Sequence, residues 1–125
     1  MTFKILKSNN IDIRANIEGS GPLIVLVHGC PESWYSWRHQ IPLLSEKGYT
    51  VAAIDVRGYG GSSKPYEIKA YSMRELTNDV IGVIDALGFE KAILMGRDWG
   101  GPIVWNTAAL NESRISAVLG LSVPF

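Results

Sequence analysis

The sequence predicts a single α/β domain, built on a mostly parallel β-sheet that begins with an antiparallel hairpin. Short apolar runs alternate with helical stretches along most of the chain, which is the pattern of a parallel sheet with right-handed helical crossovers. The first two apolar segments are instead joined by only a few turn residues. The length of 125 residues corresponds to about one domain, since domains usually take ~100–200 residues.

The N-terminal hairpin is predicted from turn residues and from alternation. A short strand over Thr2–Leu6 is followed by the turn residues Ser8-Asn9-Asn10. Four apolar residues then alternate with polar neighbours, namely Ile11, Ile13, Ala15 and Ile17. A period of two is typical of a half-buried strand, so we expect the two segments to pair in antiparallel fashion.

Four later apolar segments need not alternate, as expected for parallel strands covered on both faces. They are Leu23–Val27, Thr50–Ile54, Ala92–Met95 and Ile115–Leu121. Three helices are predicted between them, over Trp37–Glu46, over Ser72–Leu87 and from Gly101 to Asn111. The second is the clearest, because Ser72 and Glu75 match a capping box and Gly88 can terminate it. Its apolar stripe consists of Leu76, Val80, Val83 and Leu87.

Composition and charge exclude several classes of protein. The chain is 46% hydrophobic and 19% charged, which is a globular composition rather than a disordered one. Twelve basic residues balance twelve acidic ones, so we expect no capture of nucleic acid or of an anionic membrane. The longest aliphatic run, Leu23–Val27, is far shorter than the ~18 residues that suggest a membrane-spanning helix.

The N-terminus and the cysteine content predict where the protein resides. Residues Met1–Lys7 contain neither a long apolar region nor a small-residue cleavage site, so we expect no signal peptide. The single cysteine, Cys30, cannot form an internal disulfide, which fits a reducing cytosol. We therefore expect a cytoplasmic protein.

The loop after the third parallel strand has the form of a nucleophile elbow. It reads Gly96-Arg97-Asp98-Trp99-Gly100-Gly101, with Asp98 where serine hydrolases carry serine. Such a sharp strand-to-helix turn needs small flanking residues, and the start of the next helix favours an ionised carboxylate. A carboxylate nucleophile forms an ester, so it suits displacement at carbon. From the elbow alone, a glycine-rich turn with a helix-capping aspartate is an equally good interpretation.

The loop after the first parallel strand is expected to supply an oxyanion hole. It reads His28-Gly29-Cys30-Pro31-Glu32-Ser33-Trp34, and ligands of such sheets lie beyond the carboxyl ends of the strands. By position, the backbone amides of Cys30 and Trp99 would hold an oxyanion. Gly29 permits close approach and Pro31 fixes the turn. The Cys30 side chain is expected to be a bystander rather than a nucleophile.

The loop after the second parallel strand carries no recognisable phosphate motif. It runs from Asp55 to Pro65, and Ser63 stands where a dinucleotide fingerprint requires its third glycine. The lysine and hydroxyl pattern of a P-loop is also missing. We therefore expect Asp55, Arg57 and the glycines to shape a structural turn, and we expect neither a cofactor nor a metal.

Taken in order, these three loops resemble those of epoxide hydrolases of the α/β-hydrolase fold, with related dehalogenases close behind. The residues that carry the resemblance are His28 to Gln40, Asp55 to Pro65 and Asp98 to Gly101. The segment Leu121–Phe125 also resembles the strand end that leads into the family's cap domain. The resemblance implies that residues 1–125 are a partial α/β-hydrolase core that lacks the cap and the last strands.

The resemblance implies a two-step reaction on a small apolar epoxide and water. Asp98 would attack an epoxide carbon to give an alkyl-enzyme ester, while cap-domain tyrosines protonate the oxygen that is released. A water molecule activated by a histidine would then hydrolyse the ester to a diol, with the amides of Cys30 and Trp99 stabilising the oxyanion. His28, Gly29 and Pro31 would support that loop. An alternative is a haloalkane or haloacid dehalogenase of the same fold.

One departure from the family's pattern is Arg97, where the family usually has histidine; we expect its side chain to meet packing or solvent. The only two histidines, His28 and His39, precede Asp98, and we expect neither to act as the general base. We therefore expect a truncated and inactive N-terminal portion of an epoxide hydrolase, with Ile115–Leu121 as an exposed edge strand. The other interpretation is a non-catalytic binding module. The oligomeric state is left open.

Overall fold

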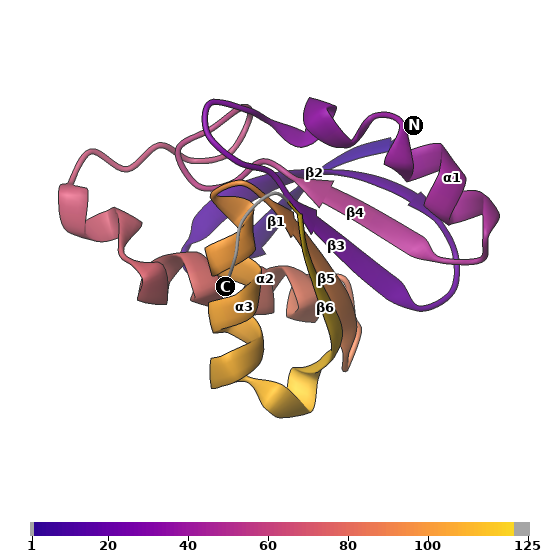
Figure 1. The fold of residues 1–125 in the computed structure, drawn as a ribbon. Helices are drawn as coiled ribbons and strands as arrows, with labels where there is room; N and C mark the ends of the chain where they lie inside the picture. The colour runs from indigo at the N-terminus through magenta and orange to yellow at the C-terminus, as the bar shows by residue number, and fades with distance from the viewer. Residues whose placement is uncertain (1, 122–125) are drawn as a thin grey trace.

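The computed structural model describes residues 2–121, which form a six-stranded sheet flanked by helices (Figure 1). The strands are β1 (Thr2–Ser8), β2 (Ile11–Gly19), β3 (Leu23–Val27), β4 (Thr50–Ile54), β5 (Ala92–Arg97) and β6 (Ile115–Leu121). The α-helices are α1 (Gln40–Glu46), α2 (Met73–Ala86) and α3 (Gly100–Leu110). Short 3₁₀ helices are η1 (Trp34–Trp37), η2 (Ile68–Tyr71) and η3 (Glu112–Arg114).

The strands lie in the order β1-β2-β4-β3-β5-β6. The N-terminal hairpin is antiparallel, and β2 also pairs antiparallel with β4. The pairs β3–β4, β3–β5 and β5–β6 are parallel. The predicted α/β class, with a hairpin leading into a mostly parallel sheet, is therefore confirmed.

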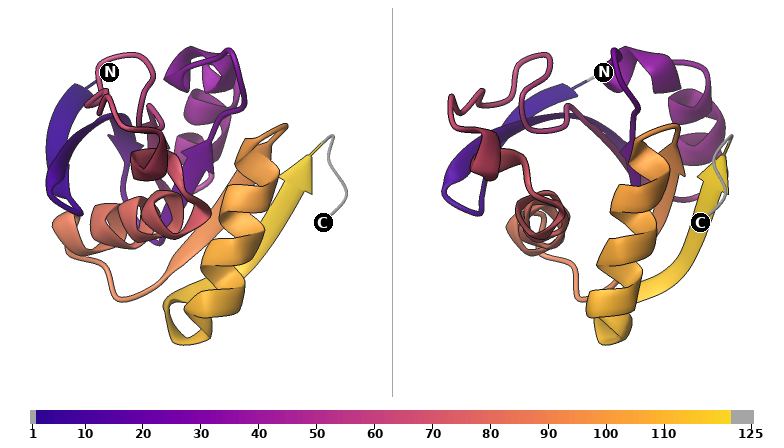
Figure 2. Two further views of the ribbon diagram at one scale, coloured as in Figure 1. Left: turned by 90° about the vertical axis from the view of Figure 1, so that its left-hand side faces the viewer. Right: turned by 60° about the vertical axis from the view of Figure 1, so that its left-hand side comes forward.

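Helices cover both faces of the sheet (Figure 2). On one face, α2 and α3 pack over a core that includes Val25, Ile54 and Leu94. On the other face, η1 and α1 bury Trp37 and Ile41 against the opposite side of β3 and β4. This two-sided burial explains why β3 is apolar at every position, because each of its residues faces a helix layer.

The predicted helix over Trp37–Glu46 is wrong only at its start, over residues 37–39. The chain instead forms the 3₁₀ helix η1, which ends at Trp37, and the α-helix begins only at Gln40. Pro42 explains the break, because it has no N–H to donate to the carbonyl of Arg38. Placed in the first turn of a helix that starts at Gln40, the proline costs no hydrogen bond.

Helix α2 confirms its predicted start and stop signals. The Ser72 side chain accepts a hydrogen bond from the Glu75 N–H, as expected of an N-cap. The helix runs from Met73 to Ala86, and Gly88 follows with a φ of 79°. That left-handed conformation is one that glycine adopts at no steric cost, so the helix ends where the sequence indicates.

The sheet brings two distant loops together. Strands β3 and β5 are parallel neighbours, and Val27 at the end of β3 lies opposite Gly96 near the end of β5. The loops that follow these strands therefore leave the sheet side by side. Strand β6 lies at the edge of the sheet, as expected, whereas the predicted lead into a cap over residues 122–125 falls outside the described part of the chain.

Candidate active site

Asp98 sits at the tip of a strained turn between β5 and α3. Its φ is 55°, in the left-handed region that non-glycine residues rarely adopt. A Cβ atom on Gly96 would lie 2.2 Å from the Gly100 carbonyl oxygen, and one on Gly100 would lie 2.1 Å from the Val27 carbonyl oxygen. The glycines are thus required by close backbone approach, as the elbow pattern predicts. Strain of this kind is often stored at functional sites.

The loop after β3 donates a backbone amide to this carboxylate. The Cys30 N–H lies 3.2 Å from Asp98 Oδ2. Gly29 makes the approach possible, because a Cβ atom at that position would lie 2.4 Å from the Asp98 Cβ. The two residues that the sequence assigned to one site therefore meet across 68 positions of sequence.

Trp99 occupies the N-cap position of α3, with helical backbone angles and a side chain that is 65% exposed. The Asp98 carbonyl accepts the N–H of Gly101, so the helix begins directly after the nucleophile candidate. The amide of Trp99 as a second oxyanion donor stays a prediction. The peptide bond between Cys30 and Pro31 is cis.

His28 is buried and engaged in local hydrogen bonds. Its Nε2 accepts the N–H of Val56 at 2.9 Å, which makes Nδ1 the protonated nitrogen that donates to the Gly29 carbonyl at 2.7 Å. Burial lowers the pKa of His28, although its hydrogen bond to Gly29 acts in the opposite direction. His28 thus braces the loop, and its ring nitrogens face backbone groups rather than Asp98.

His39 is exposed at the N-terminus of α1. The sequence contains only these two histidines. That neither of them activates a water beside Asp98 stays a prediction.

The loop after β4 is a structural turn, as its sequence suggests. The buried Asp55 accepts hydrogen bonds from the backbone of Trp34 and Gly61, both at 2.9 Å, and from Arg14 Nε at 2.8 Å. One carboxylate therefore ties the loop to η1 and to β2. No phosphate-binding arrangement is needed to explain these residues.

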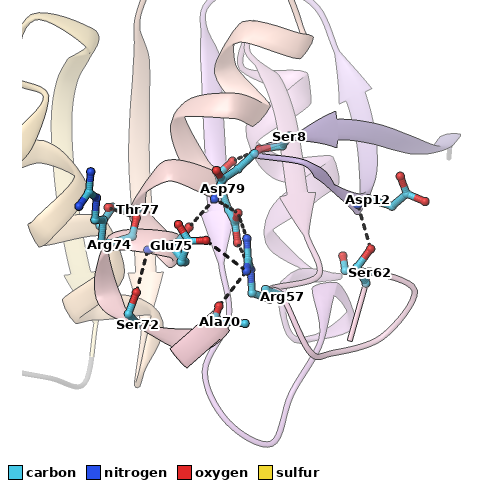
Figure 3. A network of polar contacts seen from close by, with 12 residues as sticks. Ser8, Asp12, Arg57, Ser62, Ala70, Ser72, Arg74, Glu75, Thr77 and Asp79 are labelled. Atoms are coloured by element: carbon cyan, nitrogen blue, oxygen red, sulfur yellow. Dashed lines mark hydrogen bonds and ion pairs between the residues drawn. The ribbon is translucent and has the colours of Figure 1, made fainter. Parts of the chain in front are cut away.

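Arg57 anchors the same loop to helix α2 (Figure 3). Its Nε and Nη2 donate to the two carboxylate oxygens of Asp79 at 2.9 and 2.8 Å, and its Nη1 donates to the Ala70 carbonyl at 2.8 Å. Both side chains of the ion pair are buried. Holding Ala70 also positions the neighbouring Tyr71, which lines the pocket described next.

A pocket of about 200 Å³ lies beside the elbow. Gly29, Cys30 and Trp99, which neighbour Asp98 in space or in sequence, form part of its lining. Most of the rest is apolar or aromatic, from Val56, Tyr59, Tyr71, Met73, Leu76 and Ile103. Such a lining fits a small apolar molecule held by few polar groups.

Tyr59 supplies a polar group to this pocket. A hydrogen bond with the Cys30 thiol, together with burial, raises the pKa of Tyr59 to about 12. The phenol therefore stays protonated at neutral pH. Sequence alone does not single out Tyr59, because nothing local indicates that its ring reaches Cys30 in the loop after β3.

Arg97 meets an ion-pair partner rather than only packing or solvent. Its Nη1 lies 3.1 Å from Glu32 Oε2, and the other Glu32 carboxylate oxygen accepts the N–H of Gly29 at 2.9 Å. The Arg97 side chain is 47% exposed. No local sequence pattern indicates this pair, although a glutamate three residues after Gly29 is compatible with a turn.

Comparison with known proteins decides the family. A family model described as the alpha/beta hydrolase fold matches residues 22–125. The chain belongs to the α/β-hydrolase fold family. Within residues 2–121 of this α/β-hydrolase chain, no helix is long and apolar enough to cross a lipid bilayer.

Several curated α/β-hydrolases are similar to this chain in sequence. Epoxide hydrolase B of Mycobacterium tuberculosis (strain H37Rv) is 58% identical over 105 residues, covering 84% of this chain and 30% of that protein. Bifunctional epoxide hydrolase 2 of Sus scrofa is 49% identical over 107 residues, covering 86% of this chain and 19% of that protein. The chain therefore spans less than a third of the length of these two relatives.

Solved structures agree with the sequence comparison. Epoxide hydrolase A from Mycobacterium thermoresistibile superposes with a TM-score of 0.96 at 50% identity, covering 98% of this chain and 39% of that one. An epoxide hydrolase from an endophytic Streptomyces gives a TM-score of 0.98 at 48% identity, covering 99% and 38%. The resemblance to epoxide hydrolases expected from the three loops is confirmed, for a chain about two-fifths as long as these structures.

Proposed function

We propose that this chain carries the nucleophile and the oxyanion amide of an epoxide hydrolase. The single observation that carries the proposal is the 3.2 Å contact between the Cys30 N–H and Asp98 Oδ2. The backbone of Asp98 is strained, and a backbone amide holds one oxygen of its carboxylate. The carboxylate is therefore oriented to attack through its other oxygen. The names of the similar proteins, and the apolar pocket beside the elbow, support an epoxide as the substrate.

In the first step Asp98 Oδ1 attacks an epoxide carbon, the carbon–oxygen bond breaks, and an alkyl ester forms. The released oxygen, an alkoxide, takes up a proton from a water molecule. In the second step water adds to the ester carbonyl, whose oxygen becomes negative where the Cys30 amide and, as proposed, the Trp99 amide can stabilise it. Collapse of that intermediate releases a diol and restores the carboxylate.

The second step needs a general base that activates water. The two histidines of this chain do not supply one, since His28 is engaged with backbone groups and His39 is exposed on α1. The ester is therefore expected to accumulate on this chain alone.

The dehalogenase alternative is not favoured, because the similar proteins described above are named epoxide hydrolases. The lone Cys30 supports a cytoplasmic protein.

The test uses the full product of the reading frame that encodes this chain. Incubation with styrene oxide in heavy-oxygen water is expected to place an adduct on Asp98 and, where the ester is hydrolysed, heavy oxygen in the Asp98 carboxylate. Peptide mass spectrometry reads both outcomes. Asp98→Asn is expected to abolish the adduct, whereas Cys30→Ala retains the backbone amide and is expected to keep it. An adduct on Cys30 alone, or neither an adduct nor heavy oxygen at Asp98, would refute the proposal.

A further inference from the structure

We propose that Arg97 and Glu32 are positioning residues that hold the Cys30 amide against the Asp98 carboxylate. This inference rests on the proposed function, since it assigns the two residues a part in the same reaction. Neither side chain belongs to the pocket lining, but Glu32 hydrogen-bonds to Gly29, which does.

Glu32 fixes the oxyanion loop through three contacts. Its Oε1 accepts the Gly29 N–H at 2.9 Å, and its own N–H donates to the Gly29 carbonyl at 3.1 Å. Its Oε2 pairs with Arg97 Nη1 at 3.1 Å. Both peptide groups flanking Gly29 are thus constrained, and the second of them carries the Cys30 N–H.

Arg97 extends this constraint to the elbow. It is the last residue of β5 and is covalently joined to Asp98. The ion pair therefore links the residue before the nucleophile to the loop that carries the oxyanion amide, across 65 positions of sequence. The loop after β3 and the elbow after β5 follow adjacent strands. The ion pair connects them in addition to the pairing of those two strands.

A stabilising role alone does not account for the arrangement. The side chains of Arg97 and Glu32 are 47% and 23% exposed, and ion pairs in contact with solvent contribute little to folding. The rate of an oxyanion-forming step, in contrast, depends steeply on donor placement, and loss of one donor costs ~10²–10³-fold. We therefore expect the Arg97–Glu32 pair to affect the rate of the oxyanion-forming step rather than the free energy of unfolding.

The test measures single-turnover formation of the Asp98 ester from styrene oxide and, where diol is released, hydrolysis of that ester, in the full product of the reading frame. Arg97→Gln is expected to slow hydrolysis of the ester by ~3–10-fold, and Glu32→Ala by ~10–100-fold, as partial losses of an oxyanion donor. Arg97→Lys keeps the charge and is expected to recover most of the rate. Combining Arg97→Gln with Glu32→Gln is expected to slow the reaction no further than Arg97→Gln alone.

Arg114→Gln is the matched control. Arg114 forms a comparable ion pair with Asp85 at 2.6 Å beside the opposite ends of β5 and β6. Its loss is expected to lower the melting temperature at least as much as Arg97→Gln, while leaving the reaction rate unchanged. An equal slowing by Arg114→Gln, or an unchanged rate in Arg97→Gln, would overturn the positioning role.

Amide hydrogen exchange provides a readout that does not depend on the reaction. Arg97→Gln is expected to speed exchange of the Gly29 and Cys30 amides by ~10-fold or more, relative to amides in the middle of β3. If the wild-type protein forms no ester, the proposed function fails, and faster exchange would still show that the pair constrains the loop. Unchanged exchange at both amides would overturn the inference by itself.

Discussion

Backbone conformation, more than side-chain chemistry, distinguishes Asp98 from the other aspartates of the chain. Its positive φ lifts the carboxylate out of the sheet, while glycines at positions 96 and 100 remove the atoms that would otherwise clash. Asp55 and Asp79, by comparison, are buried and fully committed to structural hydrogen bonds. The surroundings therefore separate one candidate nucleophile from two structural aspartates.

At the scale of single residues, His28 is predicted to make folding stability dependent on pH. Its pKa in the folded protein is lowered, chiefly by burial, so the unfolded chain binds a proton more readily. The free energy of unfolding is expected to fall as the pH drops below about 6.5, the ordinary value for histidine. Urea denaturation at a series of pH values measures this effect.

The control is His39→Gln, which removes the exposed histidine and is expected to leave the pH dependence unchanged. An NMR titration of the two imidazoles checks the cause directly. His28 titrating at or above the value of an ordinary histidine would contradict the prediction.

At the scale of elements, the Arg57–Asp79 pair joins helix α2 to the rest of the fold. Asp79 also accepts the side-chain N–H of Asn9 at 3.0 Å, and its backbone carbonyl accepts the Ser8 hydroxyl at 2.7 Å. Burial raises the pKa of Asp79, while Arg57 and Asn9 oppose that shift. The pair thus connects α2, the loop after β4 and the turn of the N-terminal hairpin (Figure 3).

Asp79→Asn is expected to lower the free energy of unfolding by about 3–5 kcal/mol, because it leaves a buried guanidinium without its carboxylate. Urea denaturation gives the value. Glu75→Gln is the matched control, since Glu75 lies 3.7 Å from Arg57 but is 36% exposed; it is expected to cost less than about 1 kcal/mol. Equal losses for the two variants would contradict the prediction.

The elements differ in how far sequence alone could predict them. Helix α2 was predictable because its cap, its apolar stripe and its terminal glycine are all local signals. The break before Gln40 depends on the missing N–H of Pro42, which prevents the helix from extending back to Trp37. The elbow followed from its glycines, whereas the Arg97–Glu32 pair depends on contacts between distant segments, which no local pattern encodes.

At the scale of the whole molecule, strand β6 is the feature expected to drive self-association in solution. It pairs with β5 at the edge of the described sheet, and Leu119 on it is 45% exposed. Edge strands with exposed apolar residues are templates for pairing with other chains. We therefore expect residues 1–125, expressed alone, to self-associate through β6.

Leu119→Lys is predicted to reduce this association, because a charged side chain on an edge disfavours strand pairing. Light scattering at rising protein concentration measures it. Leu110→Lys is the matched control, as Leu110 is 68% exposed but lies on α3 rather than on the edge. An equal reduction by both variants would show that general hydrophobicity, and not strand pairing, drives association.

The contact between the Cys30 amide and Asp98 also constrains the order in which the molecule assembles. The two groups are 68 residues apart, and β3 must pair with β5 before they can meet. Long-range pairing of this kind requires loop closure, which is slow and entropically unfavourable. A folding intermediate that contains only the first four strands would hold the oxyanion loop with no carboxylate against it. Rapid labelling at Asp98 by an epoxide is therefore expected only from molecules in which β3 and β5 have already paired.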